Sequence, residues 1–196
     1  EPGDGLLGRL IRAHGDELDD EELAGLADGV LIGGHETTAS MLALGTIALL
    51  ENPDAAAVVR DGDAAAVHDA VEELLRYLSV VQVAFPRFAR SDIDIDGQHI
   101  EAGDLVLCSL SGADHDAALG DGMDGLKVSR ASTSHLAFGH GIHRCVGSEL
   151  ARMELRIAFP ALLRAFPGLR LDVAPAEISF HEYSVVFGVD DLPVSW

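Results

Sequence analysis

The sequence has few cysteines, a single lysine and no long uncharged apolar run. Its two cysteines, Cys108 and Cys145, lie far apart in the 196-residue chain, which excludes a disulfide framework and a Cys-x-x-Cys pair for metal or redox chemistry. No stretch of about 18 uncharged apolar residues is present, and the first residues have neither the basic end nor the apolar run of a signal peptide. We therefore expect a cytoplasmic protein in a reducing compartment, with no membrane partner.

Positive charge is also scarce. Only 13 lysine and arginine residues oppose 33 aspartate and glutamate residues, and the formal net charge is -20. Such a charge repels nucleic-acid backbones and anionic membrane surfaces, so neither is an expected partner. The five basic residues between positions 144 and 170 are all arginines, Arg144, Arg152, Arg156, Arg164 and Arg170, and they form a local basic stretch in an acidic chain. The first residue is not methionine, which is a first indication of a fragment.

Composition and hydrophobic periodicity predict one mostly α-helical domain of the α+β class. The content of 48% hydrophobic and 23% charged residues fits a single globular domain over residues 1–196. The predicted helices cover about residues 6–11, 19–52, 53–60, 64–79 and 146–166. The predicted strands cover about residues 80–89, 93–95, 99–100, 105–110, 169–173 and 181–189. Asp96-Gly97 is expected to form a hairpin turn.

The long predicted helix extends beyond the body that one domain of this size can form. At 1.5 Å per residue it would measure roughly 50 Å, whereas a compact chain of this length has a diameter of roughly 42 Å. Residues 27–32 and 39–50 are apolar on nearly all sides of the helix, so they require neighbours all round. We expect a covering partner, either a missing N-terminal half of the same protein or a second copy of the chain.

Residues 138–147, Phe-Gly-His-Gly-Ile-His-Arg-Cys-Val-Gly, carry the strongest chemical signal. Glycines allow the backbone to turn tightly around Cys145, which precedes a predicted helix whose N-terminal N–H groups stabilise a thiolate. A bound metal or haem would protect this thiolate from oxidation. Two alternatives remain at this point. One is an inert buried cysteine, and the other is a zinc site with the ligands His135, His140, His143 and Cys145.

This segment resembles the haem-binding loop of the cytochrome P450 superfamily, Phe-Gly-x-Gly-x-His-x-Cys-x-Gly, with every fixed position filled. The resemblance implies the C-terminal half of a bacterial cytochrome P450 fold, with haem b as cofactor and O2 as co-substrate. It implies that Cys145 is the axial thiolate ligand of the haem iron, the ligand whose electron donation favours O–O cleavage. It further implies that Phe138, Gly139, His143 and Gly147 contact the haem, with His143 at a propionate.

A second match lies in the long helix at residues 33–38, Gly-Gly-His-Glu-Thr-Thr. It resembles the family's Ala/Gly-Gly-x-Asp/Glu-Thr-Thr motif, in which small residues let the helix open locally and admit a water. By this resemblance Gly34 lies beside the haem, and Glu36 and Thr37 are catalytic residues that deliver protons to bound oxygen. From the residues alone, a glycine kink with threonine back-bonding is the alternative. A zincin motif is excluded because position 39 is alanine.

Two further matches concern charged residues. Glu73 and Arg76 have the Glu-x-x-Arg spacing, and the resemblance implies a buried structural ion pair behind the haem loop, although this spacing alone is also typical of a surface pair. Phe85-Pro86-Arg87 resembles the family strand whose arginine binds a propionate. Arg87 is suited to bidentate contact with a carboxylate, and an ordinary strand-end arginine is the alternative.

One position departs from the family pattern. Family members have a further arginine that joins the pair formed here by Glu73 and Arg76, in a segment before the haem loop, and the alignment places Gly125 at that position. The ion-pair group is therefore expected to be incomplete. Because a partly unpaired buried charge is costly, we expect this departure to weaken the folding of the segment and the retention of haem.

The resemblance implies a haem-thiolate monooxygenase domain that inserts one oxygen atom from O2 into an apolar small molecule, by hydroxylation or epoxidation. Electrons would come from a ferredoxin-type donor that docks on the basic stretch around Arg144, Arg152 and Arg156. We expect this chain to be inactive alone, because half of the fold lies outside it. The alternative is a truncated non-catalytic relative that binds haem weakly or not at all and acts as an interaction or scaffold module.

Overall fold

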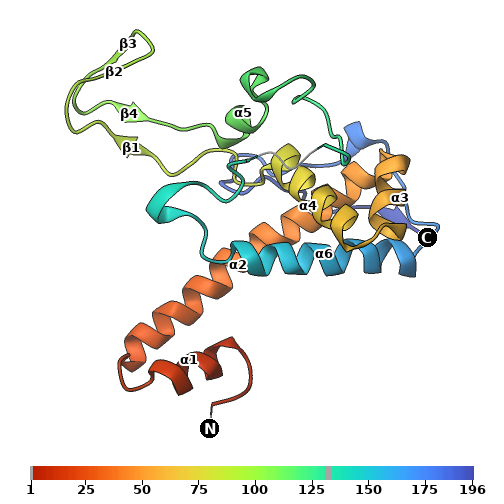
Figure 1. Cartoon of the computed structure of the whole chain (residues 1–196), viewed down its shortest axis with the longest axis horizontal. Coiled ribbons are helices and arrows are strands. Elements are labelled where there is room, and N and C mark those ends of the chain that lie inside the picture. The colour runs from red at the N-terminus through yellow and green to blue at the C-terminus, as the bar shows by residue number, and fades with distance from the viewer. Residues whose placement is uncertain (1, 131–133) are drawn as a thin grey trace.

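The computed structural model describes residues 2–130 and 134–196, which form a helical body with small two-stranded sheets at its edges (Figure 1). The longer helices are α1 (Leu6–His14), α2 (Asp20–Leu50), α3 (Pro53–Asp61), α4 (Ala64–Leu78) and α6 (Ser148–Ala165). The shorter helical elements are α5 (Leu110–Asp114), η1 (Ala117–Leu119), η2 (Gly141–His143) and η3 (Pro175–Glu177). The strands are β1 (Arg87–Phe88), β2 (Ile93–Ile95), β3 (Gln98–Ile100), β4 (Leu105–Val106), β5 (Arg170–Leu171) and β6 (Val194–Ser195). This is the mostly α, α+β architecture that the sequence predicts.

Helix α2 begins with a capping box. The side chain of Asp19 accepts the N–H of Glu22 at 2.8 Å, and the side chain of Glu22 accepts the N–H of Asp19 at 3.0 Å. These two bonds satisfy N–H groups that have no partner inside the helix. From this start α2 runs without interruption to Leu50, close to its predicted bounds. The local opening expected at Gly33-Gly34 is therefore not present in the structure.

The two halves of α2 lie in different surroundings. The C-terminal half passes through the body, where Met41, Leu44 and Leu49 are buried. The N-terminal half projects from the body (Figure 1), and there Leu31 and Ile32 are 66% and 75% exposed. The expectation of neighbours on all sides is thus met for the second half of the helix, while the first half has no such cover among the described residues.

The core lies where α2, α3, α4 and α6 meet. Fully buried side chains from these four helices are, in order, Leu49, Val59, Leu74 and Phe159. Helix α2 packs closely against α6 at Gly45, where an added Cβ would overlap the ring of Phe159. The missing side chain at position 45 therefore lets the Phe159 ring pack directly on the backbone of α2.

Replacing Gly45 by alanine is expected to lower the free energy of unfolding. The added methyl group must displace the Phe159 ring, and overpacking of this kind costs about 1–3 kcal/mol, against a gain in helix propensity of about 1 kcal/mol. Denaturant unfolding followed by circular dichroism measures the change. Gly25→Ala on the same helix is the matched control, because a Cβ there meets nothing within 4 Å, and it should stabilise the helix. Equal stability of the two variants would contradict the close packing at Gly45.

The β structure is shorter than the sequence predicts. Strands β2 and β3 form the expected hairpin, and Asp96 and Gly97 have φ angles of 49° and 79°, as a tight two-residue turn requires. The expected strand over residues 80–89 is reduced to β1 and a single bridge between Val83 and Ser109. The expected strand over 105–110 ends early, because the Ser109 side chain accepts the N–H of Gly112 at 3.0 Å and starts helix α5.

Among the described residues, no helix taken singly has the length and apolar composition to cross a bilayer. Helices α2 and α3 meet that test only when they are counted together, and they are bent by 117° at the break between them.

Candidate active site

The loop at residues 138–147 presents the thiol of Cys145 at the start of α6. Gly139 and Gly141 have φ angles of 69° and 80°, a region that favours glycine, and they turn the chain back on itself. The N–H of Cys145 donates to the carbonyl of Phe138 at 2.9 Å and closes the turn. Cys145 is exposed, and Gly147 caps α6. The thiol thus lies close to the positive end of the helix dipole, where a thiolate is stabilised.

The surface around Cys145 is open and carries exposed apolar side chains. Ile142 and Val146, which flank the thiol in sequence, are 95% and 99% exposed, and a Cβ added at Gly139 or Gly141 would meet nothing within 4 Å. A soft sulfur ligand, apolar neighbours and open space over glycines are what a haem bound through a thiolate needs. The inert buried cysteine of the sequence alternatives is wrong, because Cys145 is exposed.

The two candidate propionate ligands are free to contact an anion. Arg87 lies in β1 and is exposed, and its Nη1 atom donates to the carbonyl of Phe85 at 3.3 Å and, weakly, to Sγ of Cys108 at 3.8 Å. His143 ends the short helical turn η2 and is exposed. Neither side chain has a carboxylate partner among the described residues. Both keep donors that a propionate could accept.

Residues 33–38 lie where α2 leaves the body. The hydroxyl of Thr37 donates to the carbonyl of Gly33 at 2.7 Å, which is the back-bonding that the sequence allowed as an alternative. This bond occupies the hydroxyl hydrogen and leaves the oxygen able to accept. Glu36 is exposed, and an added Cβ at Gly34 would meet nothing within 4 Å. The hydroxyl of Thr38 donates to Oε2 of Glu154 at 3.4 Å and so connects α2 to α6.

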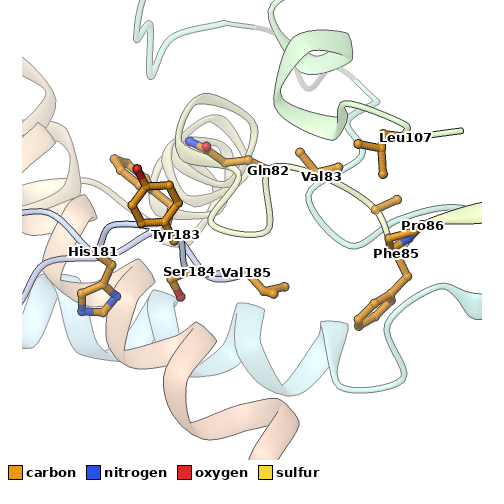
Figure 2. Close-up of a pocket in the computed structure, with 11 residues that line it drawn as sticks. Gln82, Val83, Phe85, Pro86, Leu107, His181, Tyr183, Ser184 and Val185 are labelled. Atoms are coloured by element: carbon orange, nitrogen blue, oxygen red, sulfur yellow. The ribbon is translucent and has the colours of Figure 1, made fainter. Parts of the chain in front are cut away.

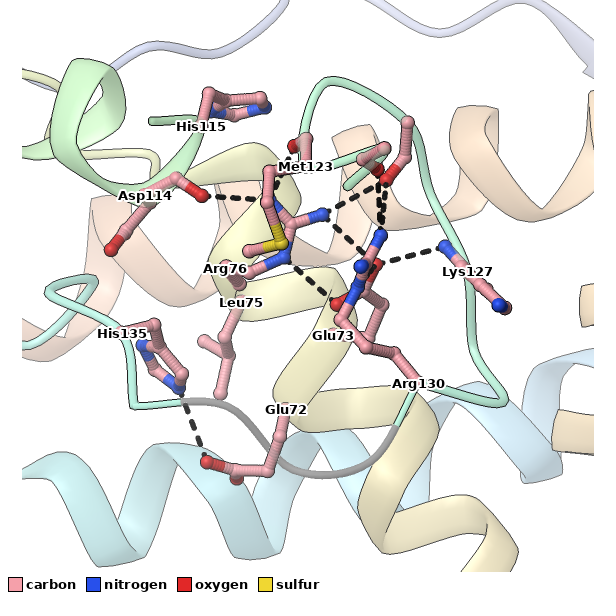
Figure 3. Close-up of polar contacts among 12 residues, drawn as sticks. Glu72, Glu73, Leu75, Arg76, Asp114, His115, Met123, Lys127, Arg130 and His135 are labelled. Atoms are coloured by element: carbon pink, nitrogen blue, oxygen red, sulfur yellow. Dashed lines mark hydrogen bonds and ion pairs between the residues drawn. The ribbon is translucent and has the colours of Figure 1, made fainter. Parts of the chain in front are cut away.

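Glu73 and Arg76 form a fully buried ion pair (Figure 3). The Nε and Nη2 atoms of Arg76 donate to the two carboxylate oxygens of Glu73 at 2.8 and 2.9 Å. The remaining N–H groups donate to the backbone carbonyls of Asp114, Met123 and Gly125 at 2.8, 2.8 and 2.9 Å. All five donors of the guanidinium therefore have a partner. Through these bonds the Arg76 side chain holds the backbone of the irregular segment that precedes the Cys145 loop.

The expected gap in this group at Gly125 is a wrong prediction. Arg130 supplies the further arginine, with its Nε atom 3.2 Å from Oε1 of Glu73 and its Nη2 atom donating to the carbonyl of Gly122 at 2.7 Å. Gly125 contributes its carbonyl, which accepts from Arg76 at 2.9 Å and from Arg130 at 3.5 Å. The segment is irregular, so sequence spacing did not fix which residue faces Glu73. Burial would raise the pKa of Glu73, but hydrogen bonds from Arg76 and from the N–H of Lys127 hold it below its usual range.

A second buried network, which sequence reasoning missed, is built on Glu72, the residue of α4 directly before Glu73. Glu72 accepts two hydrogen bonds from Arg152 of α6, at 2.7 and 2.9 Å, and lies 3.2 Å from Nε2 of His135. Burial would raise the pKa of Glu72, but the bonds from His135 and Arg152 lower it to about 2. The only feature of the sequence that pointed to this network was Glu72 itself, a second glutamate directly before Glu73.

This network also revises two sequence hypotheses. His135 bonds to Glu72. Within residues 2–130 and 134–196, no group of three or more histidine, cysteine or acidic side chains could hold a metal ion. The zinc alternative is therefore not supported. Of the basic stretch, Arg152 binds Glu72, and Arg156 binds the carbonyl of Arg152 and the ring of His68. Arg144 remains exposed, with Glu149 at 3.9 Å.

A cavity of about 490 Å³ lies beside these elements (Figure 2). One wall is the segment that follows α4, and the other is the C-terminal segment before β6. Its apolar part includes Val83, Phe85, Leu107 and Val185, and its polar part includes Gln82, His181 and Tyr183.

Comparisons with known proteins agree with this arrangement. The sequence model of the family described as cytochrome P450 matches residues 4–119 and 123–181. Cytochrome P450 105C1 of a Streptomyces species is 50% identical over 196 residues, which cover all of this chain and 51% of that protein. Cytochrome P450-SU2 of Streptomyces griseolus is 48% identical over 195 residues, which cover 100% of this chain and 48% of that protein. The chain thus spans about half the length of the curated relatives that it matches.

Solved structures give the same result for the fold. Cytochrome P450 MoxA from Nonomuraea recticatena superposes with a TM-score of 0.91 at 43% identity and covers all of this chain and 49% of its own. A cytochrome P450 implicated in an oxidative C–C coupling reaction during vancomycin biosynthesis superposes with a TM-score of 0.90 at 47% identity, over 100% of this chain and 50% of its own. Since the matches include both the Cys145 loop and the buried Glu73–Arg76–Arg130 group, the chain belongs to the cytochrome P450 family.

Proposed function

We propose that this chain carries the haem-thiolate centre of a monooxygenase that inserts one oxygen atom from O2 into an apolar small molecule. The observation that carries the proposal is the exposed thiol of Cys145, held on a glycine turn at the N-terminus of α6. The alternative of a non-catalytic scaffold rested in part on an incomplete ion-pair group, and Arg130 removes that support.

Haem b, bound through Cys145, supplies the activation of O2, and electron donation from the thiolate favours O–O cleavage. The chain's own residues hold the group in place. The Cys145 thiolate would bind the iron, Arg87 and His143 would bind the propionates, and Phe138, Gly139 and Gly147 would contact the haem from the loop. Gly34 leaves room on the side of α2, since an added Cβ there meets nothing within 4 Å.

Glu36 and Thr37 are the proposed proton-transfer residues. Thr37 keeps its hydroxyl fixed by the bond to Gly33 at 2.7 Å, so its oxygen can accept a hydrogen bond from a water. Glu36 is exposed one position earlier and can take up protons from solvent. A carboxylate next to an alcohol forms a short relay for protons.

Three further parts of the proposal concern partners. The cavity beside Phe85, Leu107 and Val185 fits an apolar small-molecule substrate. A ferredoxin-type protein is the proposed electron donor, with Arg144 as the exposed cation near the thiolate. The exposed apolar side chains in the first half of α2 need cover, which either an N-terminal half like that of the full-length relatives or a second copy would provide.

Replacing Thr37 by alanine is expected to uncouple the reaction. In the complete haem-loaded enzyme, product formed per reductant consumed should fall roughly tenfold or more, since the hydroxyl serves proton delivery, while reductant consumption changes less. Parallel assays of product and of reductant oxidation measure this ratio.

Thr46→Ala is the matched control for this experiment. Thr46 lies on the same helix and makes the same back-bond, from its hydroxyl to the carbonyl of Leu42 at 2.7 Å, but inside the core. Its ratio should stay at the wild-type value. If Thr37→Ala forms as much product per reductant consumed as Thr46→Ala does, proton delivery does not use Thr37.

A further inference from the structure

The network of Glu72, Arg152 and His135 connects three segments that are distant in the sequence. Glu72 comes from α4, Arg152 from α6, and His135 from the segment that leads into the Cys145 loop. The guanidinium of Arg152 bonds both carboxylate oxygens of Glu72, at 2.7 and 2.9 Å, and the side chains of Arg152, Glu72 and His135 are only 13%, 11% and 4% exposed. A bidentate pair with this little solvent contact has a fixed geometry.

Glu72 and Glu73 serve different parts of the molecule, although they are neighbours on α4. The two side chains point in different directions in Figure 3, where Glu73 faces Arg76, Arg130 and Lys127, and Glu72 faces His135. The Glu73 group holds the segment around residues 122–130. The Glu72 group instead holds the segment that runs directly into the Cys145 loop.

His135 has one defined hydrogen-bonding pattern. The N–H of Ala137 donates to its Nδ1 atom at 3.2 Å, so this nitrogen acts as an acceptor. The other nitrogen, Nε2, then carries the hydrogen and donates it to Oε2 of Glu72 at 3.2 Å. His135 therefore links the carboxylate of α4 to the backbone one residue before Phe138.

Phe138 receives contacts from both Arg152 and His135. The Cζ atom of Arg152 lies 4.6 Å from the centroid of the Phe138 ring, within the range of a cation–π interaction. The ring centroid of His135 lies 6.2 Å from that of Phe138. The carbonyl of the same Phe138 accepts the N–H of Cys145 at 2.9 Å. A single residue thus connects the buried charge network to the backbone of the proposed thiolate ligand.

We propose that Arg152 is a positioning residue for Cys145: together with Glu72 and His135 it fixes Phe138, and Phe138 fixes the Cys145 backbone through its carbonyl. The step from Cys145 to haem rests on the function proposed above, while the positioning of the loop does not. Because the charge of Arg152 is neutralised by Glu72 and by Glu149, whose Oε1 atom accepts from its Nη1 atom at 3.1 Å, its action is geometric. This role also removes Arg152 from the surface that an electron donor would contact.

The test is amide hydrogen exchange of the full chain without haem, in the variants Arg152→Met and Arg152→Lys. The lysine keeps a positive charge opposite Glu72, so the fold is maintained, but its ammonium group cannot bond both oxygens and lie flat over Phe138. In both variants the Cys145 amide should exchange about tenfold faster, and the amide of Phe159 in the core of α6 should keep its wild-type rate. Arg164→Met, an exposed arginine on the same helix, is the control and should change neither rate.

A spectroscopic measurement accompanies the exchange experiment. In the haem-loaded enzyme, a smaller fraction of the ferrous carbon monoxide complex should show the thiolate-type Soret band in the Arg152 variants than in Arg164→Met. An unchanged Cys145 amide in both Arg152 variants would overturn the proposal, as would equal acceleration at Cys145 and Phe159, which signals general destabilisation. A wild-type enzyme without the thiolate band would refute the proposed function, and the exchange rates would still decide the role of Arg152.

Discussion

Replacing Cys145 by alanine should abolish the red-shifted Soret band that thiolate-ligated haem shows in its ferrous carbon monoxide complex. Cys145 is the cysteine that lies on the glycine turn at the N-terminus of α6, where the dipole and the free N–H groups stabilise the thiolate. No other side chain of the loop offers a sulfur ligand, so the expected loss is complete. Absorption spectroscopy of the haem-loaded enzyme under carbon monoxide makes the measurement.

Cys108→Ala is the matched control. Both cysteines are exposed and free, but Cys108 lies between β4 and α5, where its Sγ atom is 3.8 Å from Nη1 of Arg87. The control variant should therefore keep the thiolate band. A band that survives in Cys145→Ala, or one that disappears in Cys108→Ala alone, would contradict the assignment of the iron ligand.

Replacing Glu73 by glutamine should lower the free energy of unfolding by about 3–5 kcal/mol, the cost of leaving a buried charge without its partner. The glutamine keeps the shape of the side chain but removes the negative charge that faces Arg76 and Arg130. The side chains of Arg76 and Glu73 are 1% and 4% exposed, so water cannot replace the lost partner. Denaturant unfolding at neutral pH measures the change.

The same pair predicts how this effect depends on pH. Since the folded protein holds the pKa of Glu73 below its ordinary value of 4.5, ionised Glu73 stabilises the fold above that pH. This contribution is lost as the pH falls below 4.5 and through the folded pKa. The difference between wild type and Glu73→Gln should therefore shrink in acid. A constant difference would show that charge is not the cause.

Asp61→Asn is the control for the Glu73 variant. Asp61 also pairs with an arginine, Arg60, at 2.7 Å, but both side chains are exposed. Solvent screens such a pair, so the stability of this variant should stay close to that of wild type. A loss as large as that of Glu73→Gln would refute the argument from burial.

Sequence and structure agree best where one residue type decides the local conformation. The capping residues Asp19 and Glu22 mark the start of α2, and the Asp96-Gly97 pair specifies the β2–β3 hairpin. Glycines at positive φ shape the Cys145 loop. These features depend on short-range sterics and hydrogen bonds, which a sequence shows directly.

Agreement is weakest where the chain has no repeating pattern. Residues 120–130 form no helix or strand, so nothing in their sequence showed that Arg130, rather than a residue at position 125, contacts Glu73. The strands at residues 80–89 and 105–110 were predicted too long, since alternating apolar residues also occur where only one bridge forms. Such pairings depend on partners that are distant in the sequence.

By itself the sequence determined the helices, the position of Cys145 just before the N-terminus of α6, and the spacing of Glu73 and Arg76. These features follow from helical periodicity and turn residues, which act over a few positions. Only the tertiary structure decided which charges meet. It paired Glu72 with Arg152 and His135, and Glu73 with Arg130, across 80, 63 and 57 residues of sequence. A buried carboxylate must find donors wherever the fold supplies them, and the packing of α4 against α6 and the preceding loops supplies them here.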